Sequence, residues 1–159
     1  GHVGKSVSIV CDTLGWQHSV FDVRSEFSNP QRFPTATKTV SCSVADFIKT
    51  QNSSSLSRFS DVLVLGHDWS VDQELLIGLL GVSPDNLRIG VIGSKSKWKG
   101  FVKAAEESGI DKDGLSNARC PIGLEIGADT PEEIAVAICA EILSMERGAY
   151  QTKTEIIPP

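Results

Sequence analysis

The sequence lacks the features of several large classes of protein. None of its apolar runs approaches the roughly 18 residues that span a bilayer, and no signal peptide is visible. It also has no long Lys/Arg cluster, and its net charge is -5, so the main term in nucleic-acid affinity is missing. We therefore expect a soluble, cytoplasmic protein that binds neither membranes nor nucleic acid.

Closely spaced cysteine pairs are absent as well. The four cysteines are far apart and form no Cys-x-x-Cys pair, which argues against both structural zinc and a disulfide framework. We predict no metal site. Cys11 and Cys139 fall on the apolar faces of expected helices, so we interpret both as core residues.

What remains is the pattern of one α/β domain, for which 159 residues and 40% apolar composition are ordinary. Strands that alternate with helices predict a doubly wound, mostly parallel sheet within residues 1–147. Residues 148–159 form a tail, either disordered or an arm. We expect helices at 3–14, 44–50, 71–80, 98–108 and 131–147, strands at 18–23, 39–41, 61–65 and 87–92, and loops at 52–57 and 110–130.

Glycines at the start of the chain indicate a nucleotide-like ligand. Gly1 and Gly4 have the spacing of the second and third glycines of G-x-G-x-x-G, and Asp22 follows eighteen positions later, where a ribose-binding acid is expected. The first glycine and its strand are missing, which suggests a fragment. In the alternative interpretation the glycines only allow close packing and Asp22 pairs with Arg24, which could otherwise reach a 2′-phosphate.

Two more turns carry polar residues after expected strands. His67 and Asp68 follow one strand, and an imidazole beside a carboxylate is a candidate general base, although such a pair is more often structural. The segment 93–97, Gly-Ser-Lys-Ser-Lys, offers N–H groups, hydroxyls and ammonium groups to a phosphate, but it lacks P-loop spacing and is equally typical of a solvated turn.

A strongly specified helix start lies at Thr130, an expected N-cap, followed by Pro131 and by Glu133 as the capping-box acid. Cys120 lies in the loop before it. Nearness to that helix N-terminus would lower the pKa of the thiol and make it reactive, whereas the alternative is a half-buried apolar residue.

Several ordered blocks resemble the XdhC/CoxI family of accessory proteins for xanthine dehydrogenase and related molybdenum hydroxylases. The blocks are Gly1-His2-Val3-Gly4, Phe21-Asp22-Val23-Arg24, Arg32-Phe33-Pro34, Leu65-Gly66-His67-Asp68, Ile92-Gly93-Ser94-Lys95-x-Lys97 and the run from Pro121 to Ala135. The likeness extends from residue 1 to about residue 145.

The resemblance implies a Rossmann-like carboxyl-terminal domain of a factor that binds molybdenum cofactor and helps to insert it into a molybdenum hydroxylase. It also implies an amino-terminal XdhC domain that these residues do not include; a homodimer is left open. The expected cofactor contacts are Gly1, His2, Val3, Gly4, Asp22, Arg24, Gly66, His67, Asp68, Gly93, Ser94, Lys95, Lys97, Cys120, Pro121, Ile122 and Gly123.

Two other functions stay open. One is an oxidoreductase that uses NAD(P), or a domain that binds another nucleotide, which the glycine spacing and Asp22 favour. Only His67, Lys95 or Lys97 could then supply the proton, so His67 is the candidate catalytic residue. The other is a module for dimerisation and for docking to the hydroxylase.

Overall fold

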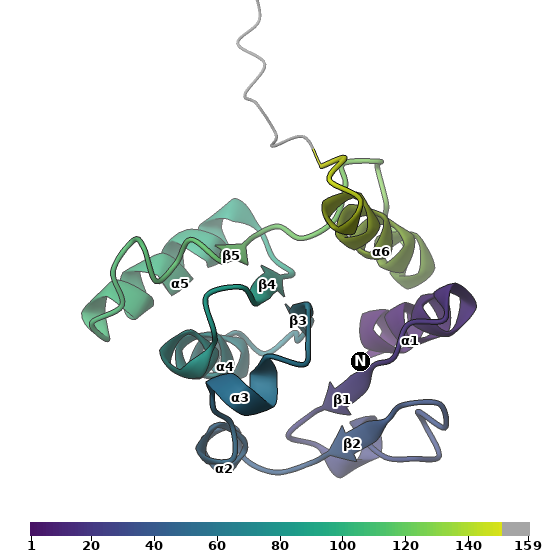
Figure 1. The fold of residues 1–159 in the computed structure, drawn as a ribbon, viewed down its shortest axis with the longest axis horizontal. Coiled ribbons are helices and arrows are strands. Elements are labelled where there is room, and N and C mark those ends of the chain that lie inside the picture. The colour runs from purple at the N-terminus through teal and green to yellow at the C-terminus, as the bar shows by residue number, and fades with distance from the viewer. Residues whose placement is uncertain (151–159) are drawn as a thin grey trace, which may run out of the picture.

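The computed structural model describes residues 1–150 (Figure 1). Most of the predicted tail, residues 151–159, lies outside the described residues. In chain order the elements are α1 (His2–Leu14), β1 (Ser19–Phe21), the 3-10 helix η1 (Ser25–Phe27), β2 (Lys38–Val40), α2 (Val44–Lys49), α3 (Ser53–Leu56), β3 (Asp61–Val64), α4 (Trp69–Val82), β4 (Arg88–Val91), α5 (Lys95–Glu107), β5 (Ala118–Arg119) and α6 (Pro131–Glu146).

The capping residues explain most differences from the prediction. The predicted loop 52–57 is wrong because Asn52 caps a helical turn there, α3, with Ser55 completing the capping box. Helix α5 begins three residues earlier than expected, at Lys95, because the Ser94 side chain accepts a hydrogen bond from the N–H of Lys97. The predicted loop 110–130 contains β5, which is too short for a period to show.

All strand pairs are parallel, as predicted, but they form two sheets. One sheet pairs β1 with β2, with Val20 opposite Thr39. The other has the order β3-β4-β5, with Val62 opposite Ile89. A cavity that both β1 and β3 line separates the two sheets, so the sequence of strands across the molecule is β2, β1, cavity, β3, β4, β5.

Helices cover both sides of these strands. Figure 1 shows α1 and α6 on one side, with α2, α4 and α5 on the other. Strand β3 alternates accordingly: Val64 packs in a cluster with Leu76 of α4 and Phe101 of α5, whereas Leu63 packs against the cluster between α1 and α6. The predicted core positions Cys11 and Cys139 are both buried, in the cluster between α1 and α6.

A buried charge network joins α6 to the strands. Glu141, 1% exposed, accepts a hydrogen bond from Arg119 Nε at 2.5 Å and another from the Gly123 N–H at 3.0 Å. Arg119 also reaches Asp61, which Arg88 contacts through two nitrogens. Glu141 therefore fixes the loop after β5 to helix α6.

No helix within residues 1–150 is long and apolar enough to cross a membrane.

Candidate functional site

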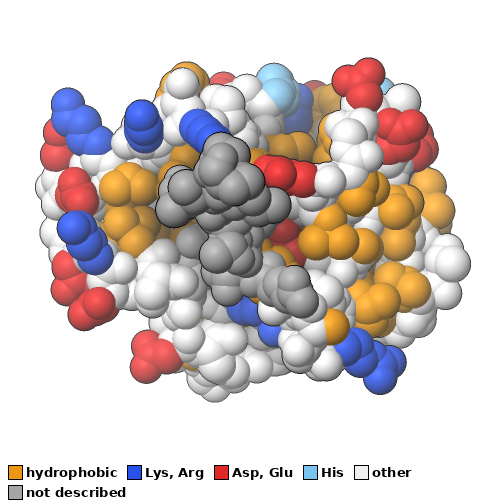
Figure 2. Space-filling model, turned by 90° about the horizontal axis from the view of Figure 1, so that it is seen from above, with side chains coloured by type: hydrophobic (Ala, Val, Ile, Leu, Met, Phe, Trp, Pro, Cys, Tyr) orange, Lys and Arg blue, Asp and Glu red, His pale blue; other side chains and the backbone are white. Residues whose placement is uncertain are grey.

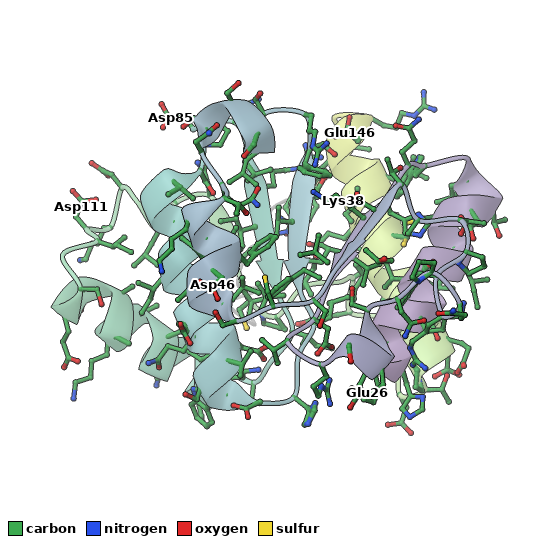
Figure 3. All side chains as sticks on the ribbon, turned by 90° about the horizontal axis from the view of Figure 1, so that it is seen from below. Glu26, Lys38, Asp46, Asp85, Asp111 and Glu146 are labelled. Atoms are coloured by element: carbon green, nitrogen blue, oxygen red, sulfur yellow. The ribbon has the colours of Figure 1, made fainter. Side chains whose placement is uncertain are left out.

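A cavity of about 760 Å³ lies between the two sheets. Figure 3 shows the two ends of the strands: Lys38, which begins β2, lies at one end, and Glu26, which follows β1, lies at the other. At the carboxyl ends the cavity brings together seven of the predicted site residues, namely Gly1, Gly4, Asp22, Arg24, Gly66, His67 and Asp68. This is the point at which strand order reverses, where ligands bind in doubly wound folds.

The N-terminus of α1 is the part of this site with unused hydrogen-bond donors. Its N-cap is Gly1, with no side-chain cap, and no acidic residue lies in its first turn. Helices α2 to α6, in contrast, are each capped by a side chain. The first N–H groups and the positive dipole end of α1 therefore remain available to an anion.

Three cationic side chains surround this helix start. Arg32 Nη2 donates to the Gly1 carbonyl at 3.5 Å, and Lys5 Nζ donates to the Arg32 carbonyl at 2.6 Å. The Arg24 and Arg32 guanidinium groups lie 3.9 and 5.1 Å from the centre of the Phe27 ring. Arg32 Nε is buried and has no hydrogen-bond partner within residues 1–150. We call Lys5, Arg24 and Arg32 the basic cluster.

Sequence reasoning did not place Lys5 or Arg32 in the site. Arg32 lies in a connection between two short strands, where no periodicity marks it, and Lys5 falls on a helix just after the glycines. The one signal was the block Arg32-Phe33-Pro34 within the family resemblance.

Asp22 and Arg24 form the ion pair that the alternative interpretation expected. The N–H and Nε of Arg24 both donate to Asp22 Oδ1 at 3.0 Å, and Nη2 donates to Oδ2 at 3.1 Å. Burial raises the pKa of Asp22, but the hydrogen bonds and charge of Arg24 outweigh it, so the net pKa is lowered. Asp22 is thus an ionised carboxylate with both oxygens engaged.

In the turn after β3, Asp68 has a structural role, whereas the side chain of His67 has no hydrogen-bond partner among the described residues. Asp68 Oδ1 accepts hydrogen bonds from the N–H groups of Ser70 and Val71, at 2.9 and 3.2 Å, and so caps α4. The exposed side chain of His67 makes no hydrogen bond or ion pair within the described part of the chain. The expected imidazole and carboxylate are adjacent in sequence, but no contact joins them.

Asp72 is a residue of this region that sequence reasoning missed. It is 3% exposed, lines the cavity and pairs with Lys97 Nζ at 2.7 Å. A Cβ on Gly66 would lie 1.9 Å from its Oδ1, which explains the glycine. The sequence did carry a signal for Asp72, because this acidic residue falls on the same helix face as Leu76 and Leu79, the buried face of α4.

The 93–97 turn is only partly free for a ligand. Ser94 caps α5, and Lys97 turns inward to Asp72 and to the Ile92 carbonyl, 3.3 Å away. Lys95 is exposed and makes no hydrogen bond or ion pair within residues 1–150. Gly93 allows the close approach of Lys97, since a Cβ there would lie 2.7 Å from its Cδ.

The 120–123 segment lies against β4 and α6 and does not line the cavity. Cys120 Sγ donates to the Gly93 carbonyl at 3.6 Å, and burial raises the pKa of its thiol, although Lys97 acts in the opposite direction. Burial dominates, so Cys120 is the half-buried residue of the alternative interpretation and not a thiol of lowered pKa. Ile122 and Gly123 are buried, and Pro121 is exposed.

The remaining predicted contacts lie on α1. His2 is exposed, and Val3 is half-buried against the cluster between α1 and α6. The predicted residues therefore form two neighbouring groups, one at the cavity and one around Lys97 and Cys120, with Asp72 joining them.

Residues 1–150 contain no group of three His, Cys, Asp or Glu residues able to hold a metal ion.

The order of strands, the helices on both sides and the crevice at the switch point define a Rossmann-like α/β domain. The chain belongs to the XdhC Rossmann domain family, whose model matches residues 1–142. It is 28% identical over 149 residues to the uncharacterized protein YqeB of Escherichia coli (strain K12), covering 94% of this chain and 26% of that protein.

A solved structure shares this fold. The crystal structure of a xanthine dehydrogenase from Bacillus halodurans matches with a TM-score of 0.76 and 25% identity, covering 98% of this chain and 43% of the other. The chain thus spans less than half the length of either protein.

Proposed function

We propose that this domain is part of an accessory protein for xanthine dehydrogenase or a related molybdenum hydroxylase, and that it binds molybdenum cofactor as cargo for insertion into that enzyme. Membership of the XdhC Rossmann domain family supports the connection to xanthine dehydrogenase. The observation that carries the binding role is the uncapped N-terminus of α1 inside the basic cluster.

The residues present fit the phosphate of such a ligand. The first N–H groups of α1 and the unpartnered Arg32 Nε are donors suited to a phosphate oxygen. Asp22 is paired with Arg24, and Glu26 and Asp68 also act on the Arg24 charge, so Lys5 and Arg32 are the cations of the cluster left for an anion. The cavity volume lies within the roughly 300–1,000 Å³ usual for small-molecule sites.

The lack of organised acid and base groups favours binding over catalysis. His67, the candidate catalytic residue, has no carboxylate to orient it because Asp68 caps α4. Lys97, a second candidate proton donor, is paired with Asp72. Within the described residues, neither His67 nor Lys97 has a neighbour placed to act with it in proton transfer.

An NAD(P)-dependent oxidoreductase is the second candidate. The position of Asp22, directly after β1 at the switch point, favours it, because a ribose-binding acid occupies this place in dinucleotide-binding domains. The ion pair with Arg24 engages both carboxylate oxygens, so a ribose hydroxyl would have to share them.

Calorimetric titration tests the proposal. Molybdopterin, NAD⁺, NADP⁺ and ATP are titrated separately into the protein and into Arg32→Ala. We expect molybdopterin to bind most tightly and Arg32→Ala to weaken it by about tenfold or more, since a hydrogen bond to a charged group contributes about 1.5–3 kcal/mol. Arg58→Ala is the matched control, because Arg58 also contributes a positive charge but lies before β3, at the opposite end of the cavity.

Two results of this titration would contradict the proposal. Tighter binding of NAD⁺ or NADP⁺ than of molybdopterin favours the oxidoreductase. Absence of binding by all four ligands leaves a dimerisation or docking module.

An apolar surface on α6 supports contact with another protein. Val136 and Leu143 are 51% and 37% exposed, and Ile9 of α1 is 54% exposed. Figure 2 shows a large group of hydrophobic side chains to the right of the grey residues on this face, and a smaller group to their left. We include in the proposal that this surface forms a homodimer. Val136→Lys should then lower the mass measured by light scattering, whereas an unchanged mass would contradict a homodimer through this surface.

A further inference from the structure

We propose that Cys11 of α1 and Cys139 of α6 form a site of reversible oxidation, at which a peroxide converts the two thiols into a disulfide that joins the two helices. The reaction involves no residue of the basic cluster, so it occurs whether or not the domain binds molybdenum cofactor.

The two thiols are in direct contact although they lie far apart in the sequence. The S–H of Cys139 donates a hydrogen bond to Cys11 Sγ. Both side chains belong to the apolar cluster between α1 and α6, and both cysteines are free. The fold therefore creates a pair of neighbouring thiols that the sequence spacing did not indicate.

The packing of the two helices favours a bond between the sulfurs. Helices α1 and α6 lie side by side and pack closely against each other (Figure 1). Ala135, one turn before Cys139, is fully buried in the same cluster, and small side chains at a contact let helix axes approach. A disulfide needs two Cα atoms within roughly 7 Å, so a close approach of the helices is the condition that the bond requires.

The two thiols differ in acidity because of their contact. The hydrogen bond from Cys139 lowers the pKa of Cys11, although burial and the charge of Asp12 act in the opposite direction. The same hydrogen bond, together with burial, raises the pKa of Cys139. Since the thiolate is the reactive form, Cys11 is the sulfur that an oxidant attacks and Cys139 is the thiol that resolves the product.

Cys11 is also the more accessible of the two. It is 9% exposed and lines the cavity, whereas Cys139 is 2% exposed and does not line it. A small neutral oxidant such as hydrogen peroxide therefore reaches the sulfur of Cys11 first.

The reaction has two steps, and its atoms and electrons balance. The Cys11 thiolate attacks one peroxide oxygen, so an S–O bond forms, the O–O bond breaks and hydroxide leaves, which makes Cys11 a sulfenic acid. Cys139 Sγ then attacks the Cys11 sulfur, so the S–S bond forms and the S–O bond breaks. The released hydroxide and the thiol protons give water. Two thiols are oxidised to one disulfide, and one peroxide is reduced to two waters.

The disulfide would tie the first helix of the domain to the last. It closes a loop that contains most of the described chain, and long loops lose the most conformational entropy in the unfolded state. We expect oxidation to raise the midpoint of thermal unfolding by about 5 °C or more. A midpoint that falls on oxidation overturns the proposal, because the bond would then form only by distorting the packed helices.

Peptide mass spectrometry tests the bond directly. The reduced 159-residue chain is treated with hydrogen peroxide at low protein concentration, and the remaining thiols are then alkylated. We expect the peptides of Cys11 and Cys139 to be joined, and dithiothreitol to separate them. The Cys11 thiol should disappear at least about tenfold faster than that of Cys120. Cys120 is the matched control because it is also partly buried, but its Sγ donates to the Gly93 carbonyl and not to a sulfur.

Two alanine variants make the result specific. In Cys139→Ala the resolving thiol is missing, so a sulfenic acid should accumulate on Cys11, and dimedone should trap at least about tenfold more of it than in the unaltered chain. Cys42→Ala should form the disulfide as before.

Two results with the unaltered chain would also overturn the proposal. One is the absence of a bond between Cys11 and Cys139 while circular dichroism shows that the chain remains folded. The other is a yield of this bond that rises with protein concentration, because the bond would then join two copies of the chain.

Discussion

Asp72 and Lys97 are a buried ion pair whose partners lie on different helices, α4 and α5, with side chains 4% and 13% exposed. Removing one partner leaves the other charge buried and unpaired, which costs roughly 3–5 kcal/mol. Lys97→Ala should therefore lower the free energy of unfolding by an amount in this range. Urea denaturation followed by circular dichroism measures it.

The neighbouring lysine supplies the control for this experiment. Lys95→Ala removes the same charge from an exposed side chain, so we expect a change within about 0.5 kcal/mol. A double variant, Asp72→Leu with Lys97→Met, should recover most of the stability lost in Lys97→Ala. Equal effects of the two alanine changes would mean that the pair does not form in solution.

The ion pair of Asp22 with Arg24 gives a pH-dependent prediction. Because the pKa of Asp22 is lowered in the folded protein, its stabilisation is complete above the unfolded-state pKa of roughly 3.9 and is lost as pH falls through the folded-state pKa. Asp22→Asn should therefore cost about 1 kcal/mol at pH 7. The difference from the natural protein should shrink toward zero in urea denaturations at successively lower pH, and a constant difference would contradict this.

Single residues were predicted from the sequence where their role is local. The pairing of Asp22 with Arg24 spans two positions, so sequence spacing was enough to expect it. The partner of Lys97 lies 25 positions away, on a helix whose placement depends on the whole fold. Sequence spacing therefore suggested a free phosphate-binding lysine where the structure has an engaged one.

Among the elements, α6 has the most complete start. The Thr130 side chain accepts a hydrogen bond from the Glu133 N–H, and Glu133 accepts from the N–H groups of Asp129 and Thr130, which lowers the pKa of Glu133. Thr130→Ala should cost about 1 kcal/mol of unfolding free energy, a usual value for an N-cap. Ser96→Ala, in the first turn of α5, removes an exposed hydroxyl with no hydrogen bond within residues 1–150 and should change little. Comparable thermal shifts in the two variants would contradict the capping role.

Elements were predictable when periodicity and caps agreed. Helix α6 has a capping box and an apolar face, and both were visible in the sequence. Helix α3 has a capping box but only four residues, too few for a helical period to show. Strand β5, with two residues, depends on its pairing with β4 rather than on any local pattern.

At the scale of the whole molecule, the cavity divides the chain into parts of unequal stability. Strands β1 and β2 form three residue pairs and are separated from the other sheet, whereas β4 has a partner on each side. In the 159-residue chain we expect amides of β1 and β2 to exchange through openings of lower free energy than those of β4. Hydrogen exchange at several low urea concentrations measures this order, and equal opening free energies would show one cooperative unit.

The two ends of the described chain are not equivalent places for attaching a dye, a surface linker or a fusion partner. Gly1 lines the cavity, and the N-terminus lies in the interior of the view in Figure 1. Tyr150 follows α6 in the chain and does not line the cavity. A foreign segment joined to Gly1 would begin at the cavity between the sheets and compete there with a ligand. A segment joined after Tyr150 would follow α6 and begin away from the residues that line the cavity. The position of a purification tag is therefore itself a variable in every binding measurement on this domain.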